Sequence, residues 1–205
     1  MRLFLVRHGQ TEANLSGVFC GTTDVRLTDV GVAQARQVAE WLKDIDFTSA
    51  TSSGLARARQ TAEIVLQPHS LTATSDTALN EMHFGDWEMR HHSELQQQDA
   101  ENWAVWVKDW QHARPTAGES FPEFSTRIDG LVQTLMTQDI QGNHLWVAHQ
   151  GVLSLLLARL LGMPAGAMWH FHFEQESYSV LDIQDGFVIQ RAFNQRTYWQ
   201  QESRE

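Results

Sequence analysis

The chain of 205 residues lacks several features that would define whole classes of protein. It has one cysteine, Cys20, so no disulfide can form within it, and a reducing compartment is the simplest interpretation. No stretch reaches the roughly 18 apolar residues that a membrane span needs. The most apolar segment, VLSLLLARLLGM (152–163), is interrupted by Arg159. Because the N-terminus also lacks a signal-peptide pattern, we expect a cytoplasmic protein that makes no membrane contact.

Positive charge is scarce as well. The 15 Lys and Arg residues are outnumbered by 25 Asp and Glu, the formal net charge is −10, and the basic residues form no cluster in the sequence. Nonspecific nucleic-acid binding depends on Lys and Arg that neutralise phosphates, so the composition argues against a nucleic-acid partner. An anionic ligand would have to be attracted by a local group of cations rather than by the protein as a whole.

Short apolar segments alternate with stretches of helical periodicity. RLFLV (2–6) is typical of a strand buried on both faces, and FTSATSS (47–53) and HLWVA (144–148) are further strand candidates. The pair Asp185-Gly186 lies between two β-rich segments and predicts a hairpin. The alternation predicts an α/β fold, a three-layer sandwich with a mainly parallel sheet flanked by helices, with the hairpin adding antiparallel strands at an edge.

The ends of several helices can also be predicted. Thr28 is a candidate N-cap, as is Ser52 or Ser53 for the helix that follows the second strand. Ser120 and Glu123 form a capping box. Residues 9–27 show no clear period and are expected to form a long loop, and a buried helix is expected over 152–162.

The middle of the chain differs from the rest, because residues 80–143 contain four tryptophans and no strong strand pattern. We therefore expect one domain, 1–205, with a helical insertion at about 88–118.

Polar residues follow each of the three predicted central strands. These residues are RHG (7–9), SSGLAR (52–57) and HQG (149–151). In an open α/β sheet, ligands bind where strands end and loops lead to helices, and helix N-termini there present free N–H groups. Two arginines and two histidines at one edge would make a compact phosphate site. The stretch FLVRHGQTEAN alone leaves four roles open for His8: turn residue, metal ligand, phosphate clamp or nucleophile.

A metal site has little support in the sequence. The adjacent His91 and His92 would point in different directions on a helix, and the pair His170 and His172 has no third ligand at a convincing spacing. We expect no metal ion and no cofactor.

Four segments together resemble the motifs of the histidine phosphatase superfamily, also called phosphoglycerate-mutase-like. They are FLVRHGQTEAN, SSGLARARQTAEIV, LNEMHFGDWE and VAHQG, and they occur in the family's order over essentially the whole chain. The resemblance implies the phosphoglycerate-mutase-like fold and a phosphomonoesterase that works through a phosphohistidine. It implies that His8 is the nucleophile and Glu81 the general acid and base. The phosphate-binding residues implied by the motifs are Arg7, Arg57, His149, Asn14 and the backbone at Gly21.

Within that superfamily, three stretches look most similar to the α-ribazole phosphatases of cobalamin nucleotide-loop assembly: LNEMHFGDWEMRHH, DWQHARPTAGESFPEFSTR and HQGVLSLLLARLLGMPAGAMWHF. The implied substrate is a small-molecule phosphomonoester, α-ribazole 5′-phosphate or adenosylcobalamin 5′-phosphate. Aromatic residues of the insertion suit a flat base, although tryptophan at helical spacing is more often part of a core. Candidate substrate-binding residues are Trp87, Met89, His91 and Gln150, of which Met89 and Gln150 depart from the common family pattern.

Two alternatives remain at this point. The first is a broad-specificity sugar or phosphoglycerate phosphatase, or a mutase, of the same superfamily. The second, more remote, is a phosphate-binding module without catalysis. The sequence makes no prediction about the oligomeric state.

Overall fold

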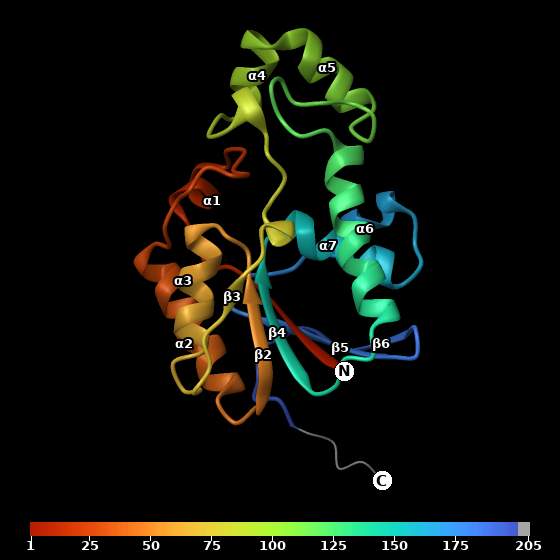
Figure 1. Ribbon diagram of the computed structural model, residues 1–205. Helices are drawn as coiled ribbons and strands as arrows, with labels where there is room; N and C mark the ends of the chain where they lie inside the picture. Colours follow the sequence, from red (N-terminus) through yellow and green to blue (C-terminus); the bar gives the residue numbers. More distant parts are fainter. Residues whose placement is uncertain (201–205) are drawn as a thin grey trace.

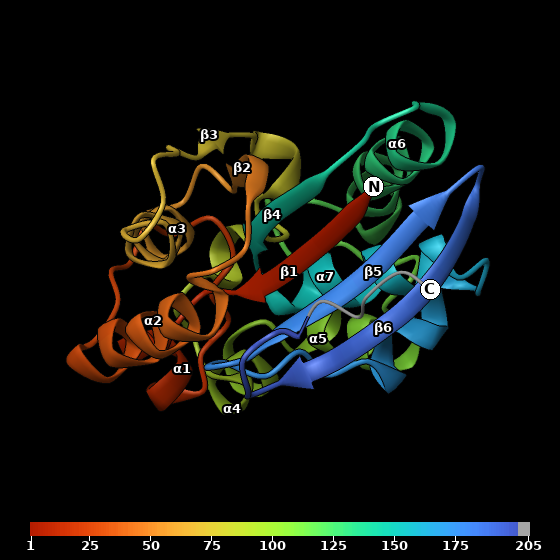
Figure 2. The same ribbon diagram turned by 90° about the horizontal axis from the view of Figure 1, so that it is seen from below.

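The computed structural model describes residues 1–200 and places their strands in one mixed sheet in the order β3-β2-β4-β1-β5-β6 (Figure 2). β4 lies between β1 and β2 and pairs in parallel with both, and β3 pairs in parallel with β2. β5 is antiparallel to β1, and β6 is antiparallel to β5. The strands span β1 Arg2–Arg7, β2 Phe47–Ser52, β3 Thr74–Ser75, β4 Asn143–Ala148, β5 Tyr178–Gln184 and β6 Phe187–Gln195.

The predicted C-terminal hairpin is present at the sheet edge. Asp185 and Gly186 form its turn with φ values of 52° and 72°. Positive φ at both central residues is what the tight two-residue hairpin turn requires, and Asp-Gly tolerates it. The prediction of a mainly parallel sheet flanked by helices, with antiparallel strands at one edge, is therefore confirmed.

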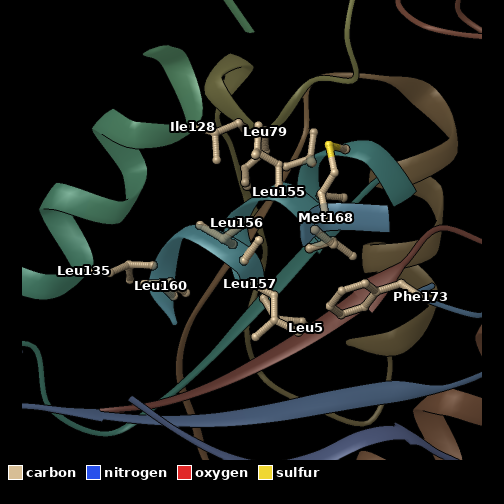
Figure 3. Packing of buried hydrophobic residues seen from close by; sticks show 14 of the residues in the cluster. Leu5, Leu79, Ile128, Leu135, Leu155, Leu156, Leu157, Leu160, Met168 and Phe173 are labelled. Atoms are coloured by element: carbon tan, nitrogen blue, oxygen red, sulfur yellow. The ribbon is translucent and has the colours of Figure 1, made fainter. Parts of the chain in front are cut away.

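Helices cover both faces of the sheet. α2 and α3 lie on one face, and α6 and α7 lie on the other (Figure 1). The alternation of side chains along β1 links the two layers, because Phe4 packs with the α2 and α3 side while Leu5 packs with the α6 and α7 side (Figure 3). The four helices span α2 Asp29–Leu42, α3 Ala56–Val65, α6 Phe121–Thr137 and α7 Gln150–Leu160.

The remaining helices are short. α4 and α5 fall within the segment predicted as a helical insertion and lie beyond the carboxyl ends of β2 and β4 (Figure 1). The capping box of Ser120 and Glu123 begins α6 as expected. The division into a single domain with an insertion stays a prediction. The short elements are α1 Glu12–Ser16, α4 His92–Gln98, α5 Ala100–Lys108, η1 Thr77–Leu79, η2 Gly85–Trp87 and η3 Ala165–His170.

Three local predictions need correction. The expected loop 9–27 contains α1, which begins with a capping box of Thr11 and Asn14. Neither Ser52 nor Ser53 caps α3, whose N-cap is Leu55. The acceptor at that helix end comes from elsewhere in the chain, because the Asp24 carboxylate accepts the Ala56 N–H at 2.6 Å. α7 begins at Gln150, two residues before the predicted start.

No helix within residues 1–200 is both long enough and apolar enough to cross a bilayer.

The loop after β1 lies directly against the N-terminal turn of α2. A Cβ built on Gly9 would lie 2.4 Å from the carbonyl oxygen of Gly31, and one on Gly31 would lie 2.2 Å from that of Gln10. Backbone atoms on both sides leave no room for a side chain. The absence of side chains at these two positions therefore fixes how closely the RHG segment packs on α2.

We expect opposite effects from two glycine substitutions in helices. Gly31→Ala should destabilise the protein by about 1–3 kcal/mol, because the methyl group overlaps backbone that cannot retreat. Gly130→Ala, in α6, meets nothing within 4 Å and should stabilise it by about 0.5–1 kcal/mol through the lower entropy of the unfolded chain. Urea unfolding of the two variants checks this, and equal effects of the same sign would contradict it.

Candidate active site

The carboxyl ends of β1, β2 and β4 bring the predicted histidines together. The His8 N–H donates to the Ala148 carbonyl at 3.0 Å, and the Ser53 N–H donates to the Val147 carbonyl at 3.0 Å. These bonds continue the strand pairing just past the ends of the strands. As a result the rings of His8 and His149 lie with their centroids 5.1 Å apart.

His8 is held as a neutral imidazole with a defined tautomer. Its Nδ1 lies 2.7 Å from the Gly9 carbonyl oxygen, which can only accept, so Nδ1 carries the proton and Nε2 keeps its lone pair. Burial, reinforced by the positive charges of Arg57 and Arg7, lowers the pKa of His8 to about 3. Near neutral pH the ring therefore offers an unprotonated Nε2.

His149 is oriented by Ser53. Its Nε2 lies 2.7 Å from the Ser53 hydroxyl, which itself accepts the Leu55 N–H at 3.2 Å. When that hydroxyl donates to Nε2, the ring proton sits on Nδ1, and Nδ1 is buried with no partner among the residues that the structure describes. Burial first, then the charge of Arg57, lowers the pKa of His149 well below its usual value. In that tautomer the ring is a neutral donor with its Nδ1–H unused.

One buried and one partly buried guanidinium group lie near the histidines. Arg57 is 1% exposed and donates to the carbonyls of Thr23 at 3.0 Å and Gly21 at 2.5 Å. Arg7 donates to the Phe173 carbonyl at 2.9 Å, while its buried Nε has no partner within residues 1–200. Burial lowers the pKa of Arg7 from its usual value. A cation with an unused donor is suited to hold an anion by a charge-assisted hydrogen bond, and the phosphate site expected at this edge stays a prediction.

Glu81 lies at the N-terminus of α7. Its Oε2 accepts the Gly151 N–H at 2.9 Å and its Oε1 accepts the Met82 N–H at 3.1 Å. A Cβ at Gly151 would lie 2.5 Å from Oε1, so glycine makes this approach possible. Burial raises the pKa of Glu81, against these two hydrogen bonds and the nearby arginine charges. The carboxyl group is therefore shifted toward the protonated form that a proton donor needs.

Glu88 is a site residue that sequence reasoning missed. Its carboxylate accepts the N–H groups of Gly21 at 2.7 Å, Thr22 at 2.6 Å and Thr23 at 2.9 Å. The carbonyls of this same segment hold Arg57. Because Glu88 accepts the Gly21 N–H, that donor is already engaged, and a contact of the Gly21 backbone with phosphate stays a prediction. The sequence signal for Glu88 was its position in the segment LNEMHFGDWE, which resembles a family motif. The neighbouring residues give no sign that the N–H groups of residues 21–23 donate to its carboxylate.

Asn14 is engaged in local structure. Its side-chain oxygen accepts the Thr11 N–H at 3.0 Å and the Gln175 amide at 2.9 Å. This oxygen orders the start of α1 and links it to the segment before β5, so a contact of Asn14 with phosphate stays a prediction.

The four candidate substrate-binding residues differ in their burial and contacts. Trp87 is fully buried and donates to Asp99 at 2.8 Å, so it packs the interior and does not line an open surface, contrary to expectation. Both ends of the Gln150 amide bind backbone, at Phe171 and Phe173, so it too is occupied. Met89 is 40% exposed at φ 60°, and His91 caps α4.

The histidine pairs weighed as metal ligands do not gather further ligands. Within residues 1–200, no three side chains of His, Cys, Asp or Glu form a group suited to a metal ion. The absence of a metal requirement stays a prediction.

This chain belongs to the histidine phosphatase superfamily (branch 1), whose family model matches residues 3–196. The adenosylcobalamin/alpha-ribazole phosphatase of Escherichia coli (strain K12) is 47% identical over 196 residues, which are 96% of this chain and 97% of that protein. The protein of the same name from Salmonella typhimurium is 46% identical, with 98% of this chain and 100% of that protein covered.

A solved structure is similar over the same length. The alpha-ribazole phosphatase from Shigella flexneri superposes with a TM-score of 0.95 at 46% identity, covering 98% of this chain and 100% of the other. The predicted family and its fold are thereby confirmed.

We expect Glu88→Gln to weaken anion binding, because an amide NH₂ replaces one acceptor and the carbonyls that hold Arg57 lose their fixed positions. The Kd for inorganic phosphate, measured by titration calorimetry, should rise on the order of 10-fold to 100-fold. The matched control is Glu63→Gln, which neutralises an exposed carboxylate on α3. Equal Kd values for both variants would show that the contacts of Glu88 are dispensable.

Proposed function

We propose that this protein is a metal-independent phosphomonoesterase that dephosphorylates α-ribazole 5′-phosphate, or adenosylcobalamin 5′-phosphate, in cobalamin nucleotide-loop assembly. The observation that carries the proposal is the cluster of two buried neutral histidines, the buried Arg57, the partly buried Arg7 and one protonatable carboxyl group. The substrate is taken from the relatives that match over nearly their full length. The single cysteine supports a cytoplasmic setting.

The first chemical step is attack by His8. Its Nε2 lone pair forms a bond to phosphorus while the bond from phosphorus to the ester oxygen breaks, giving phospho-His8 and an alcohol. The Gly9 carbonyl holds the Nδ1 proton during attack and stabilises the positive charge that develops on the ring. Glu81 donates its proton to the departing oxygen, which would otherwise leave as an alkoxide.

The second step returns the enzyme to its starting state. Glu81, now a carboxylate, removes a proton from a water molecule that attacks phosphorus on phospho-His8. The bond between phosphorus and Nε2 breaks, inorganic phosphate is released, and Glu81 is protonated again. One carboxyl group therefore serves as acid and then as base, which suits a pKa raised by burial.

The remaining groups stabilise the phosphoryl oxygens. The unused Nε of Arg7 and the unused Nδ1 of His149 are donors already in place before substrate arrives. Arg57 adds a buried positive charge held by the 21–23 segment. Fixed donors cost no reorganisation as charge develops in the transition state, so they supply what a metal ion supplies elsewhere. Asn14 is a further candidate for phosphate contact.

The arrangement also suggests how the chain is organised. We take residues 1–205 as one histidine-phosphatase domain with an insertion at about 88–118, whose helices α4 and α5 lie beyond the carboxyl ends of β2 and β4 (Figure 1). Met89 and His91 in that segment remain candidates for substrate contact.

We expect the purified protein to hydrolyse α-ribazole 5′-phosphate with a kcat/KM at least about tenfold above those for 3-phosphoglycerate and sugar phosphates, a preference of about 1.4 kcal/mol. After mixing with labelled substrate and rapid quenching, the wild type should carry an acid-labile, alkali-stable phosphoryl group, and His8→Ala should carry none. Higher kcat/KM for sugar phosphates would overturn the substrate, and full turnover by His8→Ala would overturn the chemistry.

We expect Glu81→Gln to be sensitive to the leaving group. For an alkyl phosphate its kcat/KM should fall on the order of 10²-fold to 10⁴-fold, whereas p-nitrophenyl phosphate, whose phenolate leaves without a proton, should lose far less.

The pH profile of kcat/KM gives an independent check on Glu81. Because the wild type needs Glu81 protonated, its kcat/KM should fall as pH rises through the raised pKa of that carboxyl group. His8, with a pKa of about 3, should cause no loss until strongly acidic pH. Glu81→Gln should lack the decline of kcat/KM at alkaline pH that the carboxyl group causes.

The leaving-group experiment has its own contradicting outcome. If the ratio of kcat/KM for p-nitrophenyl phosphate to kcat/KM for the alkyl phosphate were the same in wild type and Glu81→Gln, Glu81 would be excluded as the general acid.

A further inference from the structure

A pocket of about 430 Å³ opens between α5, η3 and three further segments, which contribute Phe19, Phe84 and Trp110. Its volume lies in the usual range for a small-molecule site. Aromatic side chains make up most of its wall, and none of the residues that line it is charged. The aromatic residues are Phe19, Phe84, Trp103, Trp106, Trp110 and Trp169.

The aromatic side chains that line the pocket pack against one another. Trp110 meets Trp169 edge to face with centroids 5.2 Å apart, and Phe19 meets Phe84 in the same way at 5.1 Å. Phe19 also packs edge to face on Trp103 at 6.0 Å. Such pairs fix the ring orientations before any ligand binds. Trp169 is nevertheless 64% exposed, an expensive position for a large apolar side chain unless something covers it.

The pocket walls are continuous with the segments that hold the two arginines. Phe19 lies two residues before Gly21, whose carbonyl binds Arg57. Phe84 is so close to the same glycine that a Cβ there would lie 2.9 Å from its ring. On the other side, Trp169 lies four residues before Phe173, whose carbonyl binds Arg7. Two separate stretches of chain therefore contribute both to the pocket wall and to the carbonyls that hold the arginines.

We propose that this pocket binds the benzimidazole base of the substrate while the arginines and histidines bind its 5′-phosphate. The inference rests on the proposed function and assigns the other end of the same substrate. Benzimidazole is a flat, largely apolar bicyclic ring, joined to the phosphate through one ribose. Aromatic walls stack on such a ring and need few polar partners to do so. Phosphoglycerate and simple sugar phosphates have no group that fills this pocket, so the pocket is the feature that selects the substrate.

The test compares two substrates that differ only in the base, α-ribazole 5′-phosphate and ribose 5-phosphate. The ratio of their kcat/KM values in the wild type measures what the base contributes. Trp169→Ala should lower that ratio about tenfold, mainly through a higher KM for α-ribazole 5′-phosphate, and Trp169→Phe should restore most of it. The control is Phe187→Ala, which removes an equally exposed ring from β6, far from the pocket lining, and should leave the ratio unchanged.

A binding measurement gives a second readout that does not depend on turnover. Free α-ribazole, which lacks the phosphate, should quench tryptophan fluorescence of the wild type, and Trp169→Ala should need about a tenfold higher concentration for half of the effect. An unchanged ratio in Trp169→Ala while the wild type still prefers α-ribazole 5′-phosphate would overturn the pocket assignment alone. If instead the proposed function were wrong, the wild type itself would show no preference for α-ribazole 5′-phosphate over the sugar phosphate panel.

Discussion

The central position of β4, paired in parallel with β1 on one side and β2 on the other, is the constraint on which the site depends. Parallel strands end at the same edge, so the residues that follow them must meet. The hydrogen bonds from His8 to Ala148 and from Ser53 to Val147 extend the pairing past the strand ends. The two imidazoles are consequently held by backbone, and any loss of register would separate them.

Burial at that edge sets the charge state of each group. Removing His8 and His149 from water beside two arginines keeps both rings neutral, while the same burial favours the protonated form of Glu81. With both rings neutral, the positive charge next to His8 comes from Arg57 and Arg7. A phosphate dianion supplies the matching negative charge, which explains how a protein with a net charge of −10 can bind an anion.

The sequence predicted the longer strands, the hairpin and the motif residues, because each is encoded by a short local pattern or a recognisable motif, whereas the two-residue strand β3 was not predicted. It did not reveal Glu88 or the Asp24 carboxylate at the start of α3, since both act on backbone amides more than 30 residues away. It also placed Trp87 and Gln150 at the ligand, whereas the fold buries the first and ties the second to backbone. Local patterns fix which residues are near a strand end, but only tertiary packing decides which of their atoms stay unused.

The contrast between groups set by strand ends and groups set by tertiary packing also separates the two parts of the proposed substrate site. In the proposed function the phosphate end is bound by groups at strand ends, which the fold places in the same way whatever alcohol the phosphate carries. The aromatic pocket is formed largely by α5 and η3, which lie outside the sheet and can vary without disturbing strand register. Arg57 and Arg7 connect the two parts, because the carbonyls that hold them belong to the chain segments that carry Phe19 and Trp169. A ring seated in the pocket therefore bears on the segments that position both guanidinium groups, so binding energy from the remote base can be used to orient the phosphate for attack.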